Sequence, residues 1–103
     1  DTGRAAGPEP LHGYVIYQGE GALEHAFGLS HELRAGGLGV VLHAGGGSLK
    51  SQMRKADASG ARYALIVGED ELKTGEVSVK PMRTQSGQFR VRREGLARAL
   101  KGN

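Results

Sequence analysis

The sequence predicts an α/β domain with a mixed five-stranded sheet: three parallel strands, an antiparallel hairpin at one edge and about three helices. Three observations predict this fold class. Strand-like apolar segments alternate with segments of helical periodicity in the first two thirds of the chain. One of them, residues 63–67, is apolar on both faces, which is typical of a buried parallel strand. The last third holds two segments with apolar–polar alternation, as in half-exposed antiparallel strands.

The size of the chain allows one domain, because 103 residues form a single core. We expect residues 1–10, rich in glycine, alanine and proline, to be a linker and residues 11–103 to form the domain. With no initiator methionine at its start, we expect the chain to be a fragment of a longer protein. No cysteine is present, which excludes disulfides and cysteine-based zinc sites. No stretch approaches the roughly 18 consecutive apolar residues that insert into a membrane.

The first part of the chain predicts two strands joined by a helix. Residues 11–17, LHGYVIY, and residues 38–43, LGVVLH, are apolar and rich in strand-forming side chains. Between them, residues 20–35 carry an apolar stripe with helical spacing, made of Ala22, Ala26, Leu29 and Leu33. A strand–helix–strand order requires a crossover, so we expect the two strands to be parallel.

A glycine-rich loop, a helix, the buried strand and an acidic turn follow. Three consecutive glycines precede Ser48, which suits the N-cap of a helix that extends to about Ala58. After the strand at residues 63–67, residues 69–71 are expected to form the acidic turn.

The last part predicts a hairpin and a terminal helix. Residues 77–80 and residues 88–92 alternate between apolar and polar side chains, with a turn at residues 84–87. Leu96 and Leu100, four apart, indicate a short helix that covers the remaining face of the sheet.

Three strand ends are expected to meet in one crevice, because ligands of open parallel sheets bind beyond the carboxyl ends of the strands. The positions expected there are Tyr17 and Gln18, then Gly45, Gly46, Gly47, Ser48, Leu49 and Lys50, and then Glu69, Asp70 and Glu71. Free N–H groups at the start of the helix suit one phosphate of a nucleic acid, with Lys50 and Arg54 beside it. The alternative is that these segments are ordinary turns.

Known catalytic and phosphate-binding motifs do not fit the sequence. Residues 45–50, GGGSLK, match neither G-x-x-x-x-G-K-[ST] nor G-x-G-x-x-G, which disfavours a nucleotide-binding enzyme. His25 and His31 do not share a helix face, and no H-E-x-x-H motif is present, which disfavours a metal site. A serine–histidine–aspartate triad has no G-x-S-x-G elbow to carry it. We therefore assign no catalytic and no metal-binding residue.

The acidic turn has three interpretations. Glu69, Asp70 and Glu71 are solvated turn residues, hold Mg²⁺, or read a nucleic-acid base. Base reading is chemically specific, because a carboxylate accepts well from the N1–H and N2–H groups of guanine, which are free in single strands. Lys80 on the neighbouring strand supplies a matching donor, and Arg83 extends the basic surface.

Charge is distributed unevenly along the chain. The formal net charge is +3, but residues 1–50 hold three basic and five acidic residues, whereas the remainder holds eleven and six. A one-sided basic half is typical of a protein that binds a polyanion, and it is also compatible with an ordinary solvated surface.

The order of motifs in the second half resembles a known family. The pattern is that of the C-terminal anticodon-binding domain of class IIa aminoacyl-tRNA synthetases, most closely the bacterial histidyl-tRNA synthetases. The residues that carry it are Gly45 to Lys50, Gln52, Ala56-Asp57, Gly60-Ala61-Arg62, Gly68-Glu69, Glu71, Val79-Lys80 and Arg83. The resemblance extends over residues 11–101.

This resemblance implies a non-catalytic domain that binds the anticodon loop of a tRNA, namely tRNA-His, and supports tRNA selection for ATP-dependent histidine attachment. Related domains place a glutamate and a basic residue nine positions later on an anticodon base, and Glu71 and Lys80 match these positions. The resemblance implies that this domain needs no cofactor. It also implies a cytoplasmic parent protein that uses ATP and Mg²⁺, carries a catalytic domain in the same chain and dimerises through other regions. The alternative is a regulatory or interaction domain of a synthetase-like accessory subunit, without RNA binding.

Overall fold

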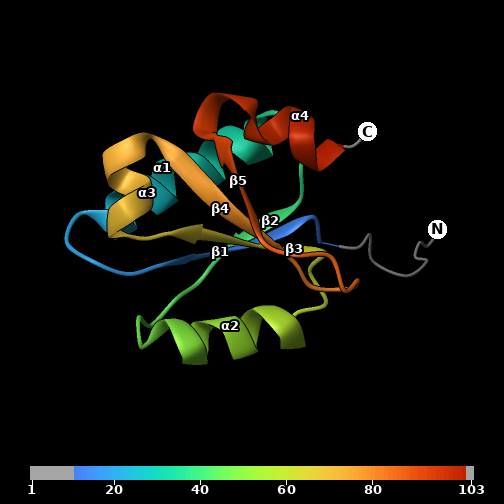
Figure 1. Cartoon of the computed structure of the whole chain (residues 1–103), viewed down its shortest axis with the longest axis horizontal. Helices are drawn as coiled ribbons and strands as arrows, with labels where there is room; N and C mark the ends of the chain where they lie inside the picture. Colours follow the sequence, from blue (N-terminus) through green and yellow to red (C-terminus); the bar gives the residue numbers. More distant parts are fainter. Residues whose placement is uncertain (1–10, 102–103) are drawn as a thin grey trace.

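The computed structural model describes residues 11–101, so the predicted linker at residues 1–10 lies outside the described part of the chain. Its centre is a five-stranded sheet with the order β2-β1-β3-β4-β5 (Figure 1). The strands are β1 (Gly13–Tyr17), β2 (Val40–Leu42), β3 (Tyr63–Val67), β4 (Glu76–Pro81) and β5 (Phe89–Arg92). The helices are α1 (Ala22–Ala35), α2 (Leu49–Ala58), α3 (Glu69–Thr74) and α4 (Leu96–Lys101), with a 3-10 turn, η1 (Arg93–Gly95), directly before α4.

The strand pairing confirms the predicted topology. β1 pairs in parallel with β2 and with β3, and β4 pairs antiparallel with β3 and with β5. The β4–β5 hairpin therefore forms one edge of the sheet. Tyr17 and Val67 are paired, so the carboxyl ends of β1 and β3 lie side by side.

The acidic segment differs in secondary structure from the prediction. Residues 69–71 open a six-residue helix, α3, so the described chain has four α-helices instead of about three. Three carboxylates in the first turn favour the helix because they lie at the positive end of its dipole. Gly75, with a φ of +75°, ends it in the left-handed conformation. Six residues are too few to show a helical period in the sequence, which explains the wrong prediction.

The helices cover the two faces of the sheet unequally (Figure 1). α1 and α4 lie over one face and share a large core with it: Val15, Ala22, Ala26, Leu29, Leu33, Leu38, Val40, Leu65, Val67, Val77, Val79, Leu96 and Leu100. α2 alone covers the other face, where it contacts β1 and β3. The core under α2 is smaller: Tyr14, Ile16, Ala56, Ala61, Ala64 and Ile66.

The alternation of side chains along β4 sends polar groups to the α2 side. Val77 and Val79 belong to the large core, so Ser78 and Lys80 lie on the opposite face, together with Arg90, which is paired with Ser78. Within residues 11–101, no helix combines the length and apolar character needed to cross a membrane.

Candidate nucleic-acid interface

A basic hollow lies between α2 and β4. It has a volume of about 490 Å³ and is lined by Leu49, Lys50, Met53, Arg54, Asp57, Lys80 and Met82. Lys50, Arg54 and Lys80 are exposed, whereas Leu49 and Met53 are half-buried between them. The hollow therefore combines an apolar floor with three cations, as in surfaces that hold single-stranded nucleic acid.

An acidic hollow adjoins it at the carboxyl ends of the parallel strands. It has a volume of about 540 Å³ and is lined by Gln18, Leu49, Met53, Ile66, Gly68, Glu69, Asp70, Glu71 and Gln88. Leu49 and Met53 line both hollows, so the two form one continuous depression along α2. We call this depression the α2 groove: basic at the end near Lys80 and acidic at the end near Glu69.

The start of α2 sets the positions of the two helix cations. The N–H of Ser51 donates to the Oγ of Ser48 over 3.1 Å, which makes Ser48 the N-cap and confirms that prediction. Lys50 and Arg54 are one turn apart and both line the basic end of the groove.

The backbone conformation of the loop before α2 explains why it consists of glycines. Gly45, Gly46 and Gly47 have φ angles of +99°, +64° and +98°, a region that residues with a side chain rarely adopt. Two buried side chains hold the loop from inside: the ring Nε2 of His43 lies 2.7 Å from the carbonyl of Gly46, and the amide of Gln52 donates to the carbonyl of Gly47 over 2.8 Å. Gly46, Gly47 and Ser48 do not line either part of the α2 groove, contrary to the predicted crevice.

Tyr17 belongs to the same internal network. Its hydroxyl donates to the carbonyl of His43 over 3.0 Å, and the Gln52 amide bonds to both its N–H and its carbonyl. The hydroxyl of Tyr14 completes the network with the Nδ1 of His43 at 2.8 Å. The prediction that the Tyr17 side chain lines the crevice is therefore wrong, whereas Gln18 does line it. Sequence reasoning missed the roles of His43 and Gln52, although buried polar residues need internal partners.

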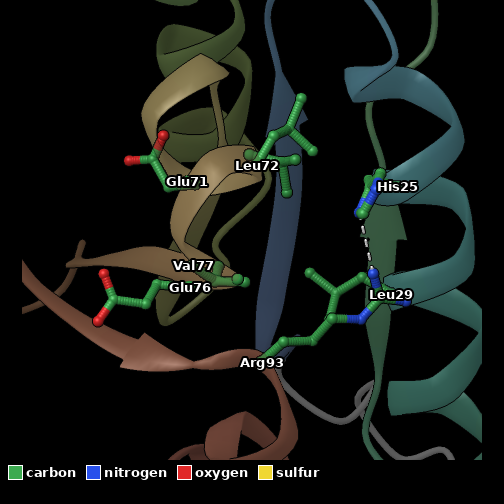
Figure 2. A pocket seen from close by; sticks show the side chains of 9 residues that line it. His25, Leu29, Glu71, Leu72, Glu76, Val77 and Arg93 are labelled. Atoms are coloured by element: carbon green, nitrogen blue, oxygen red, sulfur yellow. Dashed lines mark hydrogen bonds between the residues drawn. The ribbon is translucent and has the colours of Figure 1, made fainter.

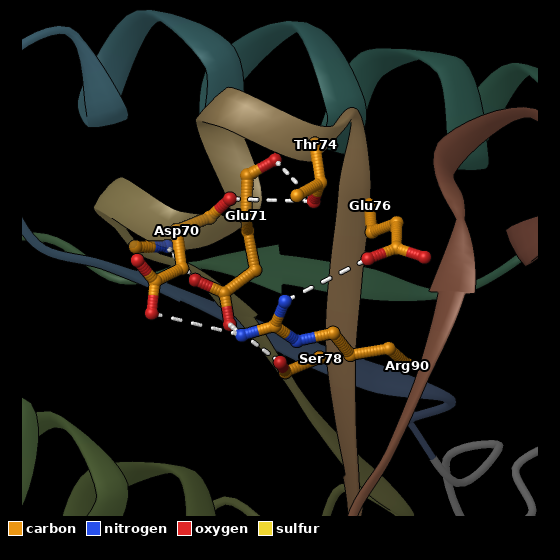
Figure 3. A network of polar contacts seen from close by, with 7 residues as sticks. Asp70, Glu71, Thr74, Glu76, Ser78 and Arg90 are labelled. Atoms are coloured by element: carbon orange, nitrogen blue, oxygen red, sulfur yellow. Dashed lines mark hydrogen bonds and ion pairs between the residues drawn. The ribbon is translucent and has the colours of Figure 1, made fainter.

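Glu71 lies at the centre of a polar network at the acidic end (Figure 3). The residue is only 8% exposed. One carboxylate oxygen accepts from the N–H of Gly68 over 3.0 Å, the other accepts from the hydroxyl of Ser78 over 2.5 Å, and Arg90 lies 3.6 Å away. Burial raises the pKa of Glu71, but the hydrogen bonds from Ser78 and the backbone, with the charge of Arg90, outweigh it and lower the pKa below its usual value.

These contacts give Glu71 a structural role that the sequence did not reveal. Its charge ties the start of α3 to β4 and β5, and its oxygens already have internal partners. Glu69 and Asp70, in contrast, are exposed where they line the groove. They are the carboxylates that an incoming ligand meets first.

Comparison with known proteins settles the family. A family model described as an anticodon binding domain matches residues 13–103 of the chain. The chain belongs to this family. The interpretation as an anticodon-binding domain, drawn from the motif order of residues 45–83, is thereby confirmed.

Several similar proteins are named as histidine–tRNA ligases or histidyl-tRNA synthetases. The domain is 54% identical over 90 residues to the histidine–tRNA ligase of Nitrosomonas europaea, which covers 87% of the domain and 21% of the ligase. It matches the apo histidyl-tRNA synthetase of S. aureus with a TM-score of 0.81 at 27% identity, over 90% of the domain and 24% of that chain. The RNA binding domain of a threonyl-tRNA synthetase from Cryptosporidium parvum shares the fold, with a TM-score of 0.83 at 20% identity, over 90% of the domain and 23% of that chain. The domain spans about a fifth of the length of the curated relatives it matches.

The anticodon-binding domain thus brings together eight of the predicted residues in its groove: Gln18, Leu49, Lys50, Arg54, Glu69, Asp70, Glu71 and Lys80. Arg83 lines a neighbouring hollow instead, and its guanidinium forms an ion pair with Asp57 and donates to the carbonyl of Asp57 over 3.1 Å. The groove also contains residues that sequence reasoning did not select, among them Met53 and Gln88. Met53 was missed because an apolar residue on a helix is typical of the core, and Gln88 because it falls in the segment predicted as a hairpin strand.

A separate small cavity in the domain is too small for an organic ligand. It lies between α1, α3 and β4 (Figure 2), has a volume of about 40 Å³ and is lined by residues that include Leu29, Leu72 and Val77. Arg93 closes it, with a bond of 3.2 Å to the ring of His25. This volume accommodates about one water molecule. Within residues 11–101, no group of three metal-ligating side chains is assembled.

Proposed function

We propose that this domain holds the anticodon loop of a tRNA in the α2 groove. The observation that carries the proposal is the arrangement of Lys50, Arg54 and Lys80 around the apolar floor of Leu49 and Met53. Cations neutralise the phosphates of the RNA backbone, and an apolar floor accepts the faces of unpaired bases. The groove therefore suits a single strand with splayed bases.

The acidic end of the groove supplies the base-reading groups in this proposal. Glu69, Asp70, Gln18 and Gln88 offer carboxylate and amide groups to the Watson–Crick edges of bases in the groove. Carboxylates favour guanine, whose N1–H and N2–H groups are donors, and the histidine anticodon begins and ends with guanine. Glu71 supports them indirectly, since it fixes α3, and Lys80 on β4 adds a cation at the basic end of the groove.

The similarity to histidine–tRNA ligases supports a wider proposal about the parent protein. We infer that the parent is a cytoplasmic histidyl-tRNA synthetase, and that this domain selects tRNA-His while a catalytic domain of the same chain attaches histidine. ATP and Mg²⁺ act in that catalytic domain, and this domain needs no cofactor. Dimerisation of the parent uses other regions.

The test is a titration of the 103-residue chain with anticodon stem-loops of several tRNAs at two salt concentrations. We expect the histidine stem-loop to bind most tightly, and all affinities to fall as salt rises, because phosphate contacts release counterions. Binding that ignores the loop sequence would contradict anticodon reading. Absence of binding to every stem-loop would favour the alternative, a regulatory domain that kept the fold without RNA binding.

A further inference from the structure

A third hollow lies at the opposite end of the sheet from the acidic end of the groove. It has a volume of about 450 Å³ and is lined by Arg62, Tyr63, Pro81, Arg83, Thr84, Ser86 and Phe89. This volume lies within the range of about 300–1,000 Å³ that is typical of small-molecule sites. None of the motifs discussed above accounts for the hollow.

The floor of this hollow is aromatic. Phe89 pairs with Val79, which belongs to the large core under α1 and α4, and Pro81 lies two residues after Val79 on β4. Tyr63 pairs with Pro81. The side chains of Tyr63, Pro81 and Phe89 therefore lie on the α1 and α4 face of the sheet, near the start of β3. Tyr63 is half-buried in the large core, whereas Phe89 is 43% exposed. Phe89 therefore presents part of its ring to a ligand in the hollow.

The rim of the hollow is basic and polar. Arg62 and Arg83 are exposed, Thr84 and Ser86 add hydroxyl groups, and no carboxylate is among the described residues that line it. An aromatic face beside guanidinium groups is the combination that holds an unpaired nucleotide, since every base has a face to stack and every nucleotide has a phosphate.

The hollow and the basic end of the α2 groove lie on opposite faces of the sheet and come together at one end of it. Asp57 lines the groove, Arg83 lines the hollow, and these two residues form an ion pair across the end of the sheet. Met82, next to Arg83, also lines the groove. An RNA strand that leaves the groove past Lys80 therefore has to pass around this end of the sheet to reach the hollow.

We propose that the hollow is a second RNA contact, which stacks one unpaired nucleotide that flanks the anticodon on Phe89 and holds its phosphate with Arg62 and Arg83. This inference rests on the proposed function, because it needs the same strand to occupy the α2 groove. The site recognises the face and phosphate of a nucleotide, so it adds affinity for a single-stranded flank without selecting its base.

The test combines three substitutions at one position with abasic RNA. Phe89→Ala should weaken binding of the histidine anticodon stem-loop about fivefold or more, the loss expected for one base–aromatic stack. Phe89→Leu, which keeps apolar volume but has no ring, should lose a similar factor, whereas Phe89→Tyr should bind as the unmodified chain does. Phe27→Ala is the matched control, since Phe27 is 64% exposed on α1. Thermal unfolding of each variant verifies that it is folded.

The RNA arm of the test replaces the loop nucleotides outside the anticodon, one at a time, with abasic ribose phosphate. Where the abasic site replaces the nucleotide that stacks on Phe89, the loop should bind the unmodified chain and the Phe89→Ala variant equally, because the base needed for stacking is already missing. If Phe89→Ala and Phe89→Leu bind all loops as tightly as the unmodified chain, the second contact is refuted, while the proposed function survives. If the unmodified chain binds no stem-loop, the proposed function itself fails.

Discussion

The two faces of the sheet differ in how much they bury. The face under α1 and α4 carries a core of thirteen buried hydrophobic residues, whereas the face under α2 carries six, three of which are alanine. The first face is covered by α1 and α4, and Leu72 of α3 packs against the same core. The second is covered by one helix that reaches only β1 and β3, and the uncovered strip beside β4 is the α2 groove.

This difference separates stability from recognition. A face that is fully packed contributes most of the hydrophobic stabilisation but offers no space for a ligand. The face that only α2 covers contributes less stabilisation, and it leaves an open groove that is lined by basic side chains of α2 and β4. Substitutions on the two faces should therefore affect different measurements.

The largest effect is expected in the core under α1 and α4. Leu96 on α4 is fully buried, so Leu96→Ala removes its packing and leaves a cavity that the sheet cannot fill. We expect a loss of about 2–5 kcal/mol in the free energy of unfolding, measured by urea denaturation. The affinity of the remaining folded molecules for the histidine stem-loop should not change. A parallel loss of affinity would show that the two faces are coupled.

A smaller effect on stability is expected at the boundary between the faces, from Glu71→Gln. The substitution keeps the size of the side chain but removes the charge that Gly68, Ser78 and Arg90 contact, and a hydrogen bond to a charged group contributes about 1.5–3 kcal/mol. We expect a loss of that order in the free energy of unfolding at pH 7.

The pH dependence of this loss checks its cause. The folded pKa of Glu71 is lowered, so its contribution is present above the unfolded value of about 4.3–4.5 and is lost as the pH falls below it through the folded pKa. The free energies of unfolding of Glu71→Gln and the unmodified chain should therefore converge once the pH is below the folded pKa of Glu71. A difference that persists at low pH would assign the loss to packing instead of charge.

The fold was predictable from sequence because its signals are local and repeated. Residues 63–67 are apolar on both faces, and the glycines after α1 end it where the periodic stripe ends. Which side chains at the site are buried and which are exposed was not predictable, because this depends on contacts between distant segments. Glu71 and Glu69 are equally acidic in the sequence, and only the contact with Ser78, seven residues away on β4, buries one of them.

The glycine loop shows the same limit. The sequence predicted that the glycines line the crevice, but a left-handed conformation held by His43 and Gln52 explains them without a ligand. Both explanations require glycine, so the sequence does not distinguish them. The hydrogen bonds that do distinguish them join segments that are distant along the chain.

A selective effect on RNA binding is expected at the acidic end of the groove. Glu69 is exposed there, so Glu69→Gln removes the carboxylate that we propose accepts from guanine, without removing a structural contact of the kind that Glu71 makes. We expect a loss of about 1–3 kcal/mol in binding the histidine stem-loop, the range of one specific base contact. A stem-loop with inosine, which lacks the N2 amino group, in place of each anticodon guanine should lose less. Inosine keeps the N1–H group, so equal losses on both RNAs would exclude a contact between Glu69 and the N2–H group of guanine.

The smallest and least selective effect is expected from Lys50→Ala at the basic end. Lys50 is exposed, so stability should change by less than about 0.5 kcal/mol. A phosphate contact does not depend on base identity, so the affinity for every stem-loop should fall by a similar factor. Removing one such contact should also reduce the slope of log affinity against log salt by about 0.7–1. Lys55→Ala is the matched control, because Lys55 is exposed on the same helix but lines neither part of the groove. If both lysine variants change the salt slope equally, the cations act through the net charge of the domain. The RNA phosphates would then not contact the α2 groove specifically.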